Sequence, residues 1–195
     1  MKETKSNKVT LWTRQDIKSV YELKKNGVIR IKRKHLEEKF GDMADYIIEL
    51  YNWFVNKADK KIEKPKDVEF PIWCSISKES TLAPTETAVI YVLEVDKSEI
   101  IYFDGVKWDR VLNHLYIPKD AKDEEEYIQT IKRKGFKDEF SVMDSEIIHF
   151  YPEEKKRIKD SWTRVFHIDK WDVFRVQANI WEIRPDMIKE IIYYK

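Results

Sequence analysis

The sequence predicts an α+β fold, in which a mixed or antiparallel sheet carries several inserted helices. Some segments alternate apolar with polar residues, as strands do, and others repeat apolar residues every three or four positions, as helices do. The segments follow the order strand, helices, several strands, helices and final strands. This order lacks the regular strand–helix alternation of a doubly wound parallel sheet.

The strands are predicted from period-two alternation and from β-branched runs. In the last long strand, Val176, Ala178 and Ile180 are expected to point one way, and Gln177, Asn179, Trp181 and Ile183 the other way. Pro185 then ends this pattern before a final apolar run. The predicted strands cover residues 9–14, 70–77, 88–95, 100–103 and 174–183.

The helices are predicted from apolar periodicity and from their end signals. Asn26-Gly27 is a typical helix C-terminus, and Pro152 suits the first turn of a helix. Residues 43–55 form the strongest amphipathic pattern. The helical predictions cover residues 17–25, 35–40, 43–55, 108–115, 118–135, 140–150 and 152–166.

Composition restricts the classes of function. The 195 residues favour a single domain, with residues 1–8 as a flexible polar arm. The 37 basic residues nearly balance the 36 acidic ones, which argues against a dedicated polyanion binder. One cysteine excludes an internal disulfide, and four scattered histidines give no metal-ligand spacing. No membrane-spanning stretch and no signal core are present, so a cytoplasmic location is expected.

The end of the first strand is the first candidate site, formed by Trp12, Thr13 and Arg14. The planar guanidinium of Arg14 suits a phosphate or a carboxylate. The alternative is an ordinary exposed charge at the end of a strand.

Two further places carry polar side chains on predicted strands. Ser75 and Ser77 lie where a strand runs into a polar loop, so their hydroxyls suit ribose or phosphate contacts. The alternative for them is ordinary turn chemistry. Gln177 and Asn179 share one face of the last long strand and could orient a polar ligand. Their alternative is a sheet edge that faces solvent.

These places, in this order, carry a resemblance to known families. The chain from residues 9–15 to residues 176–182 resembles a family of uncharacterised bacterial proteins, a domain of unknown function. It also resembles, more distantly, the ADP-ribosyltransferases, especially bacterial toxins that modify nucleic acid. The segments that carry the second resemblance are residues 11–27, 71–77, 92–104, 174–182 and 187–192.

The second resemblance implies a split core that binds NAD between two small sheets. Arg14 would hold the pyrophosphate or ribose, and Ser75 and Ser77 would line the nicotinamide side. Gln177, with Asn179 or Glu182, would face the reacting sugar. The glutamate that stabilises the cationic sugar in that family falls on Asn179, which brings no negative charge. Either Glu182 or another carboxylate supplies that charge, or the domain binds without turnover.

The expected function is therefore an ADP-ribosyltransferase-like domain that binds NAD or a related nucleotide. Transfer of ADP-ribose would go to a nucleic acid or a protein, in a bacterial or phage conflict system such as a toxin or a defence effector. One alternative is a catalytically inactive nucleotide-binding module. The other is a non-enzymatic protein-interaction or inhibitor module, because seven Trp residues are many for this length and Trp is common at binding hot spots.

Overall fold

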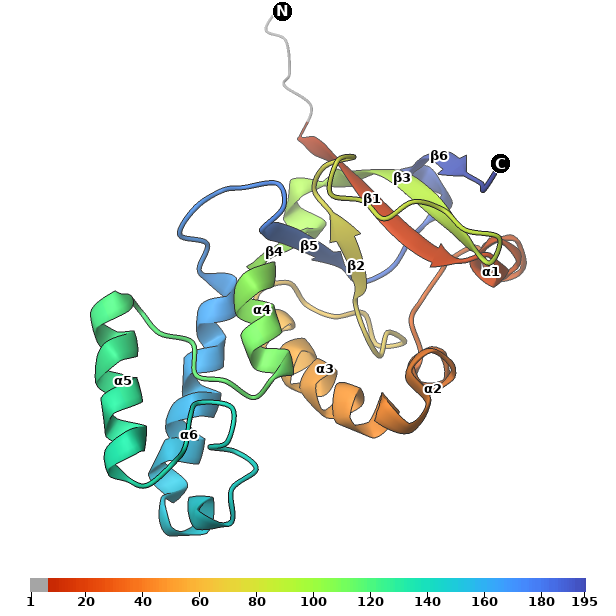
Figure 1. Cartoon of the computed structure of the whole chain (residues 1–195). Helices are drawn as coiled ribbons and strands as arrows, with labels where there is room; N and C mark the ends of the chain where they lie inside the picture. The colour runs from red at the N-terminus through yellow and green to blue at the C-terminus, as the bar shows by residue number, and fades with distance from the viewer. Residues whose placement is uncertain (1–6) are drawn as a thin grey trace, which may run out of the picture. The chain divides into compact units, whose positions relative to one another are not determined.

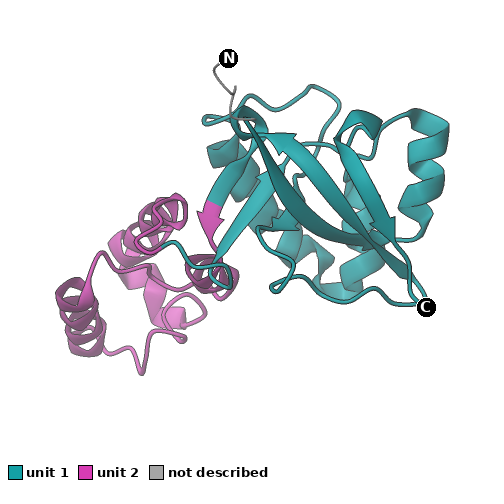
Figure 2. Cartoon of the chain, turned by 90° about the horizontal axis from the view of Figure 1, so that it is seen from above, with its two compact units in different colours: residues 1–102, 171–195 teal, residues 103–170 magenta. Residues whose placement is uncertain are grey.

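The computed structural model describes residues 7–195, and the chain forms two compact units (Figure 2). Unit 1 comprises the chain up to Tyr102 together with Trp171–Lys195, and unit 2 comprises Phe103–Lys170. The prediction of a single domain stays a prediction. The predicted arm falls mostly on residues 1–6, which lie outside the described residues, and the first strand already begins at Lys8.

Unit 1 is built on a six-stranded sheet with the order β4-β5-β2-β1-β3-β6, in which the last two residues of β4 already count with unit 2 (Figure 1). The pairs β1–β2, β1–β3, β2–β5 and β3–β6 are antiparallel. This confirms the α+β prediction, but the strands share one sheet, so the split core of two small sheets is not confirmed. The strands are β1 (Lys8–Asp16), β2 (Ile72–Ser75), β3 (Ala88–Asp96), β4 (Ile101–Asp104), β5 (Val176–Ile180) and β6 (Ile188–Ile192).

One face of this sheet carries the main apolar core of unit 1. The alternating side chains of four strands meet there, and Leu11, Tyr91, Leu93 and Ala178 are fully buried. Helix α1 (Lys18–Asn26) packs its apolar side chains against this core. The helix ends at Gly27, whose φ of 70° is the left-handed conformation that glycine adopts most easily. The predicted C-terminal signal of this helix is confirmed.

The other face of the sheet is covered in part by α3 (Ala44–Ala58), the helix predicted over residues 43–55. Its Tyr51 and Phe54 rings each lie with their centroids 5.1 Å from that of Trp73 on β2. The remaining helical segments of unit 1 are α2 (Arg33–Phe40), η1 (Gly41–Met43), η2 (Lys97–Glu99) and η5 (Pro185–Met187).

Strand β5 is shorter than predicted, which corrects the expected direction of one side chain. The strand ends at Ile180, and the chain bends at Trp181, whose indole N–H donates to the Ile62 carbonyl over 2.9 Å. The backbone of Ile183 then pairs with Ile29. Because of this bend, Ile183 packs into the same core as Ala178 and Ile180 instead of pointing the opposite way.

Unit 2 is helical. Its helices pack around buried apolar side chains, among them Trp162, Tyr127 and Ile131. The predicted helix over 140–150 is only a short 3-10 helix, η3 (Glu146–Phe150), and the predicted helix over 152–166 changes to 3-10 geometry at Trp162. The helical segments are α4 (Gly105–Leu112), α5 (Ala121–Arg133), η3, α6 (Pro152–Ser161) and η4 (Trp162–Phe166).

No helix within residues 7–195 is both long enough and apolar enough to cross a membrane.

Candidate functional site

The three candidate segments are far apart in sequence but lie on adjacent strands. Strand β2 lies between β5 and β1 (Figure 1). The register places Trp12 opposite Ser75, and Ser75 opposite Gln177. Residues opposite each other in an antiparallel sheet point to the same face. These three side chains therefore form one row across the sheet, which we call the Trp12 row.

The Trp12 row lies on the face that α3 covers only in part. Trp12 and Ser75 are half-buried, whereas Gln177 is exposed. Arg14 follows two residues along β1, so it points to the same face, and it is exposed. The row and Arg14 thus present an aromatic ring, a hydroxyl, an amide and a cation on a rigid platform of strands.

A second cation lies near Arg14. One guanidinium nitrogen of Arg14, Nη1, donates to the carbonyl of Ala83 over 3.4 Å. Lys39 of α2 is exposed overall, yet desolvation of its ammonium, and then the positive charge of Arg14, lower the pKa of Lys39. This repulsion indicates that an anion bound at this end of β1 would be favoured by both cations.

The two candidate serines take part in a tight hydrogen-bonded loop. The Ser75 hydroxyl donates to the carbonyl of Ser80 over 3.1 Å. The hydroxyl of Ser77 lies 3.2 Å from that of Ser80 and accepts from the Ser80 N–H, and Thr81 donates to the Ser77 carbonyl. Ser77 is buried, and this network matches the alternative of ordinary turn chemistry. Only Ser75 joins the Trp12 row.

Thr13 points to the opposite, apolar face of β1. It is buried, its hydroxyl donates to the Trp73 carbonyl over 2.7 Å, and it accepts from the Gln15 amide over 2.7 Å. This side chain links β1 to β2 and does not join the other candidate residues.

Asn179 shares the face of Gln177 but lies where α3 covers the sheet. It is opposite Trp73 and has no exposed surface. Its Nδ2 donates to the Ile72 carbonyl over 3.3 Å, while its Oδ1 has no hydrogen-bond partner within residues 7–195. Burial also raises the pKa of the nearby Tyr51 to about 12. Asn179 is therefore part of an apolar environment.

Glu182, the other residue expected near the reacting sugar, is held in an ion-pair cluster. Its Oε2 accepts from Nε and Nη2 of Arg30 over 2.9 and 2.8 Å. Its Oε1 lies 3.5 Å from Nη1 of Arg184. The Glu182 carboxylate lines a small cavity of about 110 Å³ together with Trp181 and Met187. None of these three residues belongs to the Trp12 row.

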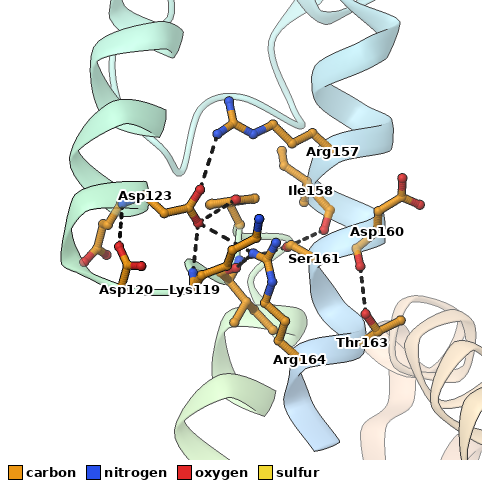
Figure 3. A network of polar contacts seen from close by, with 12 residues as sticks. Lys119, Asp120, Asp123, Arg157, Ile158, Asp160, Ser161, Thr163 and Arg164 are labelled. Carbon is orange, nitrogen blue, oxygen red and sulfur yellow. Dashed lines mark hydrogen bonds and ion pairs between the residues drawn. The ribbon is translucent and has the colours of Figure 1, made fainter. Parts of the chain in front are cut away.

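The structure also contains a polar cluster that the sequence interpretation missed. In unit 2, Asp123 of α5 lies among Lys119, Arg157 and Arg164 beside a cavity of about 420 Å³ (Figure 3). Arg157 and Arg164 are seven residues apart, two turns of a helix, so the spacing could have placed both on one face. The surrounding Lys/Glu-rich sequence hides that signal.

The described part of the chain contains no group of three or more His, Cys, Asp or Glu side chains arranged to hold a metal ion.

A six-stranded sheet with a polar row on its partly open face defines unit 1 as an α+β domain with a candidate ligand-binding surface. The chain belongs to a family described as a domain of unknown function (DUF3841), which matches residues 10–189. No curated protein and no solved structure matches the chain.

Proposed function

We propose that unit 1 binds NAD or a related nucleotide over the Trp12 row, as an ADP-ribosyltransferase-like module. The observation that carries this proposal is the register of β1, β2 and β5. It aligns Trp12, Ser75 and Gln177, which come from three of the five segments in which the sequence resembles ADP-ribosyltransferases. Local sequence patterns do not determine strand pairing, so this alignment is independent of the pattern that suggested the family.

The exposed groups on this face suit the parts of a dinucleotide. The Trp12 ring offers a face for stacking a base or a nicotinamide ring. The exposed Gln177 amide can both donate to and accept from a carboxamide or ribose. Arg14, with Lys39 near it, suits the pyrophosphate, because a guanidinium binds phosphate oxygens with two parallel hydrogen bonds. A bound NAD would supply an ADP-ribose group and nicotinamide as its leaving group.

The two positions that the resemblance matches to the catalytic glutamate bring no free negative charge to this face. Asn179 is neutral and buried, and the Glu182 carboxylate is paired with Arg30. Loss of one such electrostatic contact commonly lowers a rate by about 10²–10³. We therefore propose a module that binds the nucleotide without efficient transfer.

The first experiment is a thermal melt of the protein with and without millimolar NAD. A ligand at 100 times its dissociation constant adds about 2.7 kcal/mol to the free energy of unfolding, or roughly 5–10 °C at this chain length. Arg14→Gln and Gln177→Ala should each reduce that shift. Lys24→Gln is the matched control, because it removes one exposed charge from α1, which packs on the opposite face.

The outcomes separate binding from transfer. An absent shift, or equal shifts in Arg14→Gln and Lys24→Gln, would contradict the proposed binding. Incubation with labelled NAD should leave protein and nucleic-acid acceptors unlabelled. Labelling that depends on Gln177 would show that transfer occurs, and loss of labelling in Glu182→Gln would identify the carboxylate responsible.

A further inference from the structure

A cavity lies wholly within unit 2, between α5 and α6. It measures about 420 Å³, within the range of small-molecule sites, which is roughly 300–1,000 Å³. Figure 3 shows the polar network beside it, with Arg157 and Arg164 directed toward Asp123. The lining residues are Tyr116, Lys119, Asp123, Glu153, Lys156, Arg157, Asp160, Ser161 and Arg164.

The Arg157 guanidinium is held in place but donates no hydrogen bond to any group within residues 7–195. Its central carbon lies 5.0 Å from the ring centroid of Tyr116 and 5.1 Å from that of Tyr127. These rings stack on each other with centroids 4.3 Å apart, so they form a rigid support. Within residues 7–195 its closest carboxylate contact is Oδ1 of Asp123 at 3.9 Å, beyond hydrogen-bond length.

Asp123 is fixed at the centre of the cluster. Its Oδ2 accepts from the Tyr116 hydroxyl and from the Lys119 N–H, each over 2.8 Å. Burial would raise the pKa of this carboxyl, but these hydrogen bonds and the charges of Arg164 and Arg157 lower it overall. Arg164 in turn donates to the Ile117 carbonyl and lies over the Tyr116 ring. Both guanidinium groups lie within ion-pair distance of Asp123, Arg157 at 3.9 Å and Arg164 at 3.8 Å, so one carboxylate offsets only part of their two positive charges.

The charges of the lining favour an anion. Its four cations, Lys119, Lys156, Arg157 and Arg164, outnumber its three carboxylates, Asp123, Glu153 and Asp160. Lys156 pairs with Asp160, and Glu153 shares the Lys134 ammonium with Glu154. A phosphate monoester carries a charge of about −1.5 to −2 near pH 7 and would be attracted by Lys119, Arg157 and Arg164.

We infer that this cavity binds the phosphate monoester group of a small molecule. Arg157 supplies the unused donor fork, Arg164 and Lys119 complete the cation set, and Asp123 acts as a positioning residue. A phosphodiester polymer suits the site less well. Such a chain would run past the carboxylates of Glu153 and Asp160, which lie in the same lining. This inference does not depend on the proposed nucleotide binding, which concerns unit 1.

The test is isothermal titration calorimetry of the full chain with glycerol phosphate, inorganic phosphate and a single-stranded oligonucleotide, at constant ionic strength. We expect glycerol phosphate and inorganic phosphate both to bind. Their binding should strengthen between about pH 5 and pH 7.5, because the second pKa of a phosphate ester is near 6 and the ligand becomes a dianion over this range. Arg157→Gln should weaken binding of glycerol phosphate about 10-fold or more, and Lys119→Gln several-fold.

Arg133→Gln is the matched control, because Arg133 is an exposed cation of α5 outside the cavity lining. Lys119 is exposed, so Lys119→Gln tests the site even if Arg157→Gln fails to fold. The inference is wrong if neither phosphate probe binds at millimolar concentration, or if Lys119→Gln and Arg133→Gln weaken binding equally. Preference for the oligonucleotide over both phosphates would also overturn it, in favour of a phosphodiester site.

Discussion

Substitution of Asn179 separates a core role from a catalytic one. The proposed resemblance to ADP-ribosyltransferases would place their catalytic glutamate at Asn179, yet this residue is wholly buried and its Oδ1 lacks a partner within residues 7–195. Two substitutions that keep the number of side-chain heavy atoms, Asn179→Asp and Asn179→Leu, should therefore differ strongly in their cost to stability. Asn179→Asp adds the negative charge that ADP-ribosyltransferases use at the matching position. Asn179→Leu removes the polar atoms of the side chain.

The magnitudes follow from the surroundings of the side chain. Asn179→Leu loses one hydrogen bond to Ile72, worth about 1 kcal/mol, but it also removes an acceptor whose burial costs about 1–3 kcal/mol. We expect a net change of about 1 kcal/mol or less in the free energy of unfolding. Asn179→Asp replaces the donor with an oxygen facing the Ile72 carbonyl, and an uncompensated buried charge costs about 3–5 kcal/mol. The expected loss of melting temperature is about 6–20 °C.

The pH dependence gives a sharper assay. Burial raises the pKa of the new carboxyl in the folded state above its unfolded value of about 3.9. The folded state then binds more protons, so the destabilisation of Asn179→Asp should be small near pH 4 and should grow as the pH rises toward 7. Thermal melts of both variants and the native protein across this range measure it. Equal stability of Asn179→Asp and the native protein at pH 7 would refute the buried assignment and would make this position available to a ligand.

Three further predictions concern other described groups. Burial raises the pKa of the Cys74 thiol to about 12, so iodoacetamide should modify it only at the rate of unfolding, and rapid labelling of the folded protein would contradict its position in the core. In the Arg30–Glu182 ion pair, the Glu182 side chain is largely buried. A double-mutant cycle with Arg30→Gln and Glu182→Gln should give a coupling of about 1 kcal/mol in the free energy of unfolding. Additive effects of the two substitutions on this free energy would refute the pairing. The pKa of Asp123 is lowered in the folded state, so its carboxylate contributes stability above about pH 4 that is lost as the pH falls. Asp123→Asn should therefore destabilise the protein more at pH 7 than at pH 3. Urea titrations at pH 7 and pH 3 measure this difference in the free energy of unfolding.

Local pattern predicted the strands better than their ends. The strand predicted over residues 9–14 is β1 in the structure, and Asn26-Gly27 correctly marked the end of α1. The phase of Ile183 was wrong because the bend at Trp181 depends on long-range hydrogen bonds, from its indole to Ile62 and from the next backbone segment to Ile29. A prediction from alternating residues assumes a continuous strand. The alternation contains no information on hydrogen-bond partners that are distant in sequence, so it could not predict the bend.

The burial of Asn179 could not be predicted for a related reason. Its alternation with Ala178 and Ile180 gave its face correctly, but a polar residue opposite an apolar face normally indicates solvent. The structure covers that part of the face with the aromatic side chains of α3. Which helix covers which half of a sheet depends on tertiary packing, and a single sequence contains little information on it. The polar cluster around Asp123 was missed because it joins residues from separate helices.

The partial cover of this face gives the candidate site its particular character. Tyr51 and Phe54 pack on Trp73, so the part of the face that includes Asn179 is a core, while the adjacent Trp12 row keeps partly or fully exposed side chains. Packing on one side locks the rotamers and the register of the strands that carry the exposed groups, and such support lowers the entropy lost when a ligand binds. The same packing removes Asn179 from any ligand that lies over the row. The residues that make the platform rigid therefore also keep Asn179, to which the proposed resemblance would assign the catalytic glutamate, out of reach of such a ligand, which is why we propose binding without efficient transfer.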